Sequence, residues 1–67
     1  MDIFAQRLKE LRLENNLSLR KLAKELLIDD TTIGRWEKQV RVPNIIELKK
    51  IAIFFKVTTD YLLGLEN

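Results

Sequence analysis

The sequence predicts an all-α fold of five short helices, and three observations lead to that class. Apolar residues recur at the helical period along the whole chain. No stretch alternates apolar and polar residues for long enough to form a strand. The chain has 67 residues, of which 46% are hydrophobic and 33% charged, and this suits one small folded domain over residues 1–67.

The first two helices are predicted from apolar stripes and the residues that end them. A helix over residues 2–14 has an inward stripe of Phe4, Leu8 and Leu11. Asn15-Asn16 can end it, because asparagine tolerates the left-handed conformation. A second helix over residues 19–26 has Ser18 as its N-cap. Its apolar face is Leu19, Leu22, Ala23 and Leu26, and its basic residues Arg20, Lys21 and Lys24 point away.

Three further helices are predicted by the same signals. The third covers residues 30–37 after the N-cap Asp29. The fourth covers residues 45–55 and is capped by Asn44, directly after Pro43. Its expected inward face is Ile45, Leu48, Ile51, Ala52 and Phe55. The fifth covers residues 59–63, between the N-cap Thr58 and the stop at Gly64.

Composition excludes several classes of function. The chain has no cysteine and no histidine, which rules out disulfides, thiolate or histidine metal sites and imidazole catalysis. Its carboxylates, serines and threonines have no base or metal constellation around them, so we expect no enzyme, no metal and no cofactor. No apolar run has membrane-spanning length, and the N-terminus lacks the pattern of a secretion signal. We therefore expect a cytoplasmic protein with no membrane partner.

The net charge of +2 is concentrated in one segment. Residues 1–17 and 44–67 are each neutral, so the whole excess lies in residues 18–43. That segment also holds two capped helices separated only by Leu27-Ile28-Asp29, a spacing typical of a helix-turn-helix over about residues 18–37.

The third helix has one apolar and one polar face. On a helical wheel Ile33 and Trp36 lie together, so we expect both in the core, and we expect Thr32 beside them to be structural. The opposite arc is the polar stripe Asp30, Thr31, Gly34, Arg35 and Lys38. Gly34 leaves a gap where the backbone can approach a surface, and a single helix fits the DNA major groove.

With these segments in place, the chain resembles the Cro/repressor-type helix-turn-helix family, the lambda-repressor-like domains. The resemblance covers nearly the whole chain without a gap, and its motifs are highly specific in this order and spacing. They are Arg7-Leu8-Lys9-Glu10-Leu11-Arg12, Leu17-Ser18, Leu22-Ala23, Thr32-Ile33-Gly34-Arg35-Trp36-Glu37, Pro43, Val57 through Asp60, and Leu62-Leu63-Gly64. It implies DNA binding, usually by a symmetric dimer, and regulation of transcription in bacteria or phages.

The resemblance also implies roles for individual residues. The base-facing positions correspond to Asp30, Thr31, Gly34 and Arg35. The phosphate-contacting positions correspond to Ser18, Lys38, Arg41 and Asn44. Arg12 and Glu37 match a pair that forms an internal salt bridge, and the position of Glu37 beside the buried arc agrees with this.

Several residues depart from the family pattern. Leu19 stands where relatives often carry a polar phosphate-contacting residue, and Leu27, Gln39 and Lys56 stand where relatives carry glycine. Asp30 places an acid where many relatives have a neutral or basic base-reading residue. This acid either accepts a hydrogen bond from a cytosine amino group or only stabilises the start of its helix.

Other residues also have two interpretations. Arg35 either contacts a guanine or a phosphate, or is a solvated arginine, and Thr31 either contacts DNA or is an ordinary surface threonine. Lys38 and Arg41 are either phosphate clamps or solvated charges. Lys21 and Lys24 are expected to be a solvated face.

Isoleucines at exposed positions of the fourth helix suggest a homodimer. The expected contact uses that helix, the loop after it and the fifth helix, through Ile46, Ile53, Thr58, Thr59 and Tyr61. The alternative is that these residues complete the domain's own core.

These observations predict a sequence-specific DNA-binding transcriptional regulator, expected to be a repressor, with residues 30–37 as its recognition helix. Its expected partners are double-stranded DNA and a second copy of the chain. The alternative is a protein-interaction or antitoxin-type module that keeps the fold but binds DNA weakly or not at all. The modest net charge, Leu19 and Asp30 favour that alternative, whereas Arg35, Lys38 and Arg41 oppose it.

Overall fold

The computed structural model describes residues 2–66, which form five α-helices and no strand. The helices are α1 (Ile3–Glu14), α2 (Leu19–Leu26), α3 (Asp30–Glu37), α4 (Ile45–Phe55) and α5 (Thr59–Leu63). The all-α class and the bounds of the last four helices are confirmed. The first helix starts one residue later than expected, because Asp2 is its N-cap and accepts a hydrogen bond from the Phe4 N–H. Residues 1 and 67 of the expected domain lie outside the described residues.

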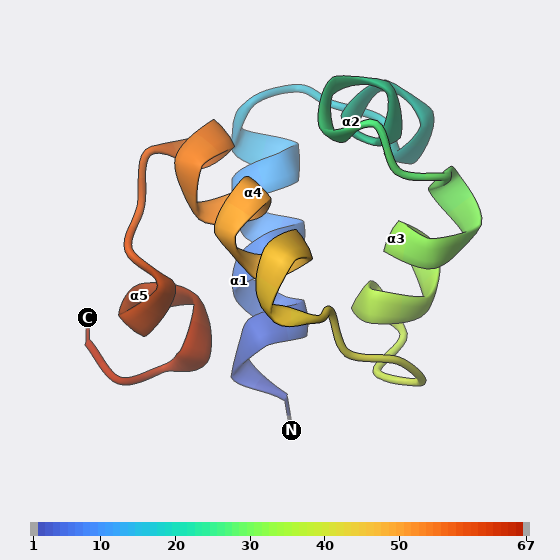
Figure 1. The fold of residues 1–67 in the computed structure, drawn as a ribbon. Helices are drawn as coiled ribbons and strands as arrows, with labels where there is room; N and C mark the ends of the chain where they lie inside the picture. The colour runs from blue at the N-terminus through green and yellow to red at the C-terminus, as the bar shows by residue number, and fades with distance from the viewer. Residues whose placement is uncertain (1, 67) are drawn as a thin grey trace.

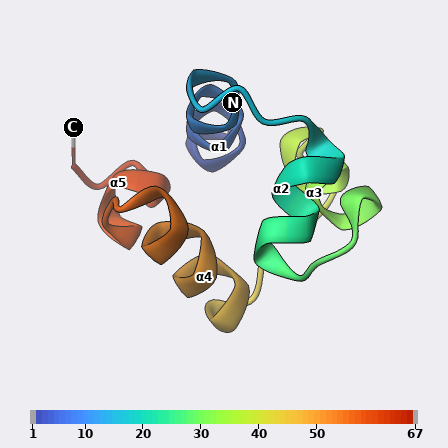
Figure 2. The ribbon, with the colours of Figure 1, turned by 90° about the horizontal axis from the view of Figure 1, so that it is seen from above.

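The helices surround a single core. α2 and α3 lie together on one side of the molecule and α5 lies on the opposite side, with α1 and α4 between them (Figures 1 and 2). α1 packs against α3 and α5, and α4 packs against α2 and α5. Every helix contributes at least one fully buried side chain to the core: Leu8, Leu22, Ile33, Trp36, Ile51 and Leu62. Burial of each such side chain stabilises the fold by about 1.5–3 kcal/mol.

The helix ends use side-chain caps at the start and left-handed residues at the close. Ser18, Asp29, Asn44 and Thr58 each accept a hydrogen bond from a backbone N–H in the first turn of the helix that follows. The residues with positive φ are Asn16, Leu27, Gln39, Lys56 and Gly64. Three of these are the positions where the resemblance led us to expect glycine, so the turns keep the family's geometry without its residue.

One expected core residue is on the surface. Ile45 was placed on the inward face of α4, but it is 86% exposed. Side chains on a helix lean toward its N-terminus. Ile45 is the first residue of α4, so its side chain leans back toward the loop over residues 38–44, most of which is itself exposed. The periodicity was correct, but no neighbouring element covers the first position.

Residues 2–66 contain neither a membrane-spanning helix nor a cluster of metal-binding side chains. None of the five helices is both long enough and apolar enough to cross a bilayer. No group of histidine, cysteine, aspartate or glutamate side chains in this range is arranged to hold a metal ion.

Candidate nucleic-acid interface

The orientation of α3 decides which of its side chains are available. Ile33 and Trp36 are fully buried, and the ring of Phe4 meets Trp36 edge-on at 6.4 Å between centroids. Asp30, Thr31 and Arg35 are exposed on the other side of the helix, and Gly34 is half-buried between them. The expected separation of a core face from a polar stripe is therefore confirmed.

Asp29 and Thr32 fasten the start of α3. The Asp29 carboxylate accepts from the Thr32 N–H at 2.9 Å and from the Thr32 hydroxyl at 3.0 Å. These two bonds, the backbone bond first, hold the pKa of Asp29 below its usual range. Thr32 is 8% exposed, in agreement with its expected structural role. The cap is complete without Asp30, whose carboxylate has no hydrogen bond to residues 2–66.

A paired charge fastens the other end of α3. The Arg12 Nε and Nη2 donate to the two Glu37 carboxylate oxygens at 2.7 and 3.0 Å. This hydrogen bonding raises the pKa of Arg12 above its usual value. Arg12 Nη1 also donates to the Leu17 carbonyl at 2.8 Å, just before α2. One arginine on α1 thus positions both helices of the helix-turn-helix.

Leu19 fills the junction between α2 and α3. A methyl group built on Gly34 would lie 3.8 Å from Leu19 Cδ1, which is ordinary van der Waals contact. Leu19 is half-buried and packs against the core, so its apolar side chain contributes to the stability of the fold. Because Gly34 has no side chain, the backbone of α3 is uncovered beside Leu19. A methyl group would fit there without a clash inside the protein.

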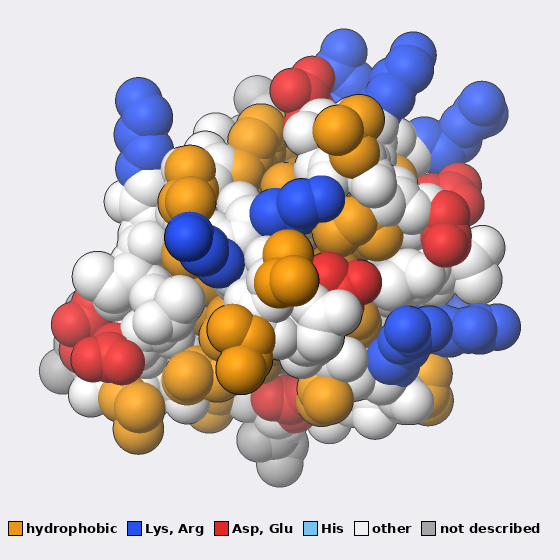
Figure 3. Space-filling model, in the orientation of Figure 1, with side chains coloured by type: hydrophobic (Ala, Val, Ile, Leu, Met, Phe, Trp, Pro, Cys, Tyr) orange, Lys and Arg blue, Asp and Glu red, His pale blue; other side chains and the backbone are white. Residues whose placement is uncertain are grey.

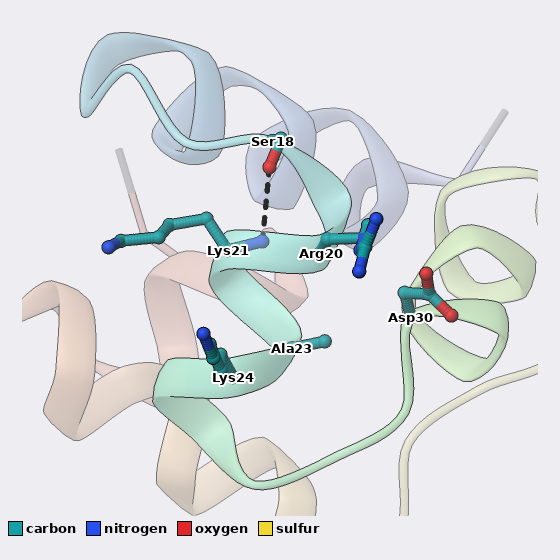
Figure 4. Close-up of a pocket in the computed structure, with 6 residues that line it drawn as sticks. All are labelled: Ser18, Arg20, Lys21, Ala23, Lys24 and Asp30. Atoms are coloured by element: carbon teal, nitrogen blue, oxygen red, sulfur yellow. Dashed lines mark hydrogen bonds between the residues drawn. The ribbon is translucent and has the colours of Figure 1, made fainter.

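Two open hollows adjoin α3, one at its first turn and one along its outer face. One is lined by Ser18, Arg20, Lys21, Ala23, Lys24 and Asp30 (Figure 4). The other is lined by Leu19, Asp30, Thr31, Gly34, Arg35 and Lys38. Asp30 lines both hollows, and it is the one acid among their lining residues. Lys and Arg side chains gather at this end of the molecule (Figure 3).

The phosphate-contacting candidates are spread around these hollows. Ser18 is exposed at the start of α2, and its hydroxyl oxygen accepts from the Lys21 N–H at 3.0 Å. Lys38 is exposed at the end of α3. Arg41 and Asn44 are exposed in the loop that follows and line neither hollow. Asn44 also forms a capping box with Glu47, with hydrogen bonds of 2.8 and 2.9 Å.

Sequence reasoning missed Arg20 at this surface. It was assigned only to the outward face of α2, yet its side chain extends toward Asp30 across the first hollow (Figure 4). A helical wheel of one helix cannot reveal this relationship, because it depends on how α2 and α3 cross.

The dimer candidates fall into two groups. Ile46 and Ile53 on α4 are 69% and 66% exposed, and Thr59 is exposed as well. Thr58 and Tyr61 have partners within the chain. The Thr58 oxygen accepts from the Tyr61 N–H at 2.9 Å, and the Arg7 guanidinium lies 4.3 Å above the Tyr61 ring. Hydrophobic side chains are visible on the face of the molecule that α4 occupies (Figure 3).

Comparison with known proteins gives consistent matches. Residues 8–62 match the model of the helix-turn-helix family. The chain is 41% identical over 64 residues to the HTH-type transcriptional activator BcrR of Enterococcus faecalis. This match covers 96% of the chain and 31% of that protein. It is 34% identical over 59 residues to the HTH-type transcriptional regulator ImmR of Bacillus subtilis. That match covers 88% of the chain and 46% of the relative.

A second Bacillus subtilis protein, named uncharacterized HTH-type transcriptional regulator YobD, is 32% identical over 65 residues. This match covers 97% of the chain and 58% of the relative. The chain therefore spans between about a third and somewhat more than half of the length of these relatives.

Proposed function

This chain belongs to the helix-turn-helix family of DNA-binding transcriptional regulators, and from that premise we propose that it binds duplex DNA sequence-specifically with α3 in the major groove. The observation that carries the proposal is the orientation of α3. Its apolar residues Ile33 and Trp36 are fully buried, which leaves Asp30, Thr31 and Arg35 free on the outer face. A helix of this diameter fits the major groove, where base edges present distinct hydrogen-bond patterns.

We assign base reading and backbone contact to different residues. Asp30, Thr31 and Arg35 read base edges, and Gly34 allows the close approach that these contacts require. Ser18, Lys38, Arg41 and Asn44 contact phosphates, which set the register of the protein and supply salt-dependent affinity. This division is supported by position, because the first group lies on one face of α3 and the second lies at helix ends and in the following loop.

We propose that the chain acts on DNA as a homodimer with two-fold symmetry. Two exposed isoleucines seven residues apart, Ile46 and Ile53, give α4 an apolar strip that no element within residues 2–66 covers. A two-fold dimer would present its two recognition helices to half-sites about 34 Å apart.

Repression remains our proposal for the regulatory effect. A bound domain that overlaps a promoter excludes the polymerase, whereas one beside the promoter can recruit it. The relative from Enterococcus faecalis is named an activator, and the two Bacillus subtilis relatives are named regulators without a direction. A reporter under the selected operator, with and without the protein, measures the direction: a rise in expression would contradict repression.

The experiment that tests the proposal is selection of bound sequences from a random duplex pool. We expect a recovered consensus with two inverted half-sites. A gel shift on random duplex at low salt accompanies it, because phosphate contacts alone should retard that DNA. If the folded protein retards no duplex and enriches no sequence, the DNA-binding proposal fails. The protein-interaction module then becomes the better description.

A further inference from the structure

Arg20 and Asp30 line the same hollow between α2 and α3. The Arg20 side chain extends from α2 toward the start of α3, where Asp30 lies (Figure 4). Among residues 2–66 the one ion pair within 4.0 Å is that of Arg12 and Glu37, so these two groups are not in contact in the free protein. Both side chains are exposed.

The N-cap of α3 does not use Asp30. Asp29 already caps α3 through its two bonds to Thr32. The Asp30 carboxylate accepts no hydrogen bond from residues 2–66, although it stands among Arg20, Arg35 and Lys38 around the two hollows. The free protein therefore keeps an unpaired acid at the centre of a basic surface.

Binding of DNA changes the energetics of that acid. When α3 enters the groove, Asp30 loses water and approaches phosphates, and both changes disfavour an uncompensated negative charge. A cation that pairs with Asp30 removes this penalty. Arg20 is suited to the task, because its planar guanidinium donates to a carboxylate while the second oxygen stays free.

Resting on the proposed function, we propose that Arg20 is a positioning residue for base reading by Asp30. On DNA the Arg20 guanidinium pairs with one carboxylate oxygen of Asp30, and the other oxygen accepts a hydrogen bond from the amino group of a cytosine. Arg20 thus determines sequence preference through Asp30, without touching the base itself.

A double-mutant cycle on the duplex recovered from the random pool tests this inference. We expect Arg20→Ala to weaken binding about tenfold when Asp30 is present, as for close charge pairs at interfaces. In the Asp30→Ala background the same change should cost less than about threefold. Both side chains are exposed, so the variants should fold, and a thermal melt checks this.

Lys21→Ala is the matched control. It removes one positive charge from the same turn of α2, and the Lys21 side chain points away from Asp30 (Figure 4). We expect it to weaken binding by the same factor in both backgrounds. Arg20→Lys, which keeps the charge, should recover part of the loss of Arg20→Ala.

Base preference distinguishes a positioning role of Arg20 from a purely structural one. A loss of stability would not change which base pair the protein prefers. Repeated selection with Arg20→Ala should relax the consensus at the same C·G pair that Asp30→Ala relaxes. If the losses of the two single variants multiply and Arg20→Ala leaves that position unchanged, the inference is overturned while the proposed DNA binding stands. If the unaltered protein binds no duplex, it is the proposed function that fails.

Discussion

At the scale of single residues, Arg35 and Lys38 stand three positions apart on one hollow, yet we assign them different tasks. Arg35 is exposed within α3, on the face opposite the buried Trp36, where a guanidinium can reach a base edge. Lys38 is the residue that ends α3, at the side of the same hollow. An ammonium at a helix end suits a phosphate, because it acts as a point charge without directional pairing.

The two tasks predict different losses on substitution. Arg35→Ala should relax preference at one base pair and cost about 1–3 kcal/mol on the selected site. Lys38→Ala should weaken all sequences alike and reduce the slope of log affinity against log salt by about one. Gel shifts on selected and random duplexes over a salt series measure both. Equal effects of the two changes on both duplexes would contradict the assignment.

Gly34 is also a residue-scale feature, because we expect its role to depend on the absence of a side chain. A methyl group there meets only Leu19 at ordinary contact distance, so alanine fits the folded protein. Gly34→Ala should raise the free energy of unfolding by about 0.5–1 kcal/mol, since alanine loses less backbone entropy in a helix. The same methyl group should weaken DNA binding by holding α3 away from the groove.

Thermal melts and gel shifts on one preparation of Gly34→Ala measure the expected gain in stability and the expected loss of DNA affinity. Gln6→Ala on the exposed side of α1 is the control, and it should leave DNA affinity unchanged. If Gly34→Ala binds DNA as tightly as the unaltered protein, α3 does not approach the groove at this position.

At the scale of helices and turns, local chemistry made most of the fold predictable. Caps such as Asp29 and Thr58 act on the next few backbone N–H groups, so a short stretch of sequence contains the whole signal. Burial at a helix end is different, because it depends on which other element reaches that end. The expected burial of Ile45 was wrong for this reason.

Two turns should gain stability from glycine. Leu27 and Lys56 close α2 and α4 with φ of 57° and 58°, a conformation that costs a side-chain-bearing residue about 1–2 kcal/mol. Both are exposed, so little burial is lost with their side chains. After the entropy cost of glycine, each of Leu27→Gly and Lys56→Gly should stabilise the domain by about 0.5–1 kcal/mol.

Lys49→Gly is the matched control for these turns. Lys49 is exposed in the middle of α4, where glycine should destabilise by about 1 kcal/mol. Urea unfolding of the three variants measures the signs. A loss of stability in both turn variants would contradict the argument from left-handed geometry.

The ion pair between α1 and α3 predicts a large loss from one substitution. Glu37→Ala leaves the guanidinium of Arg12 nearly buried without its partner, and we expect a cost of about 3–5 kcal/mol. Glu25→Ala removes the same group from an exposed position on α2 and should change stability by less than about 0.5 kcal/mol. Urea unfolding compares the two, and similar small losses would show that the pair is not needed.

At the scale of the whole molecule, relations between helices were the least predictable part of the site. The stripe on α3 followed from its own periodicity. The approach of Arg20 to Asp30 and the contact of Leu19 with Gly34 depend on how α2 and α3 cross. The contacts of Arg7 with Tyr61 likewise join residues far apart in sequence, and a local sequence pattern does not predict such a pair.

The last prediction concerns how two copies of the molecule meet. Ile46 and Ile53 leave an apolar strip on α4, and pairing with a second copy would remove it from water. We therefore expect sedimentation at micromolar concentration to show dimers, and Ile46→Ser with Ile53→Ser to give a folded monomer. That monomer should bind one half-site weakly and lose its preference for half-sites about 34 Å apart. Val40→Ser, at an exposed valine in the loop after α3, should leave the dimer intact. A strict monomer on and off DNA in the unaltered protein would rule out this arrangement, because the α4 strip would then have no second copy to cover it.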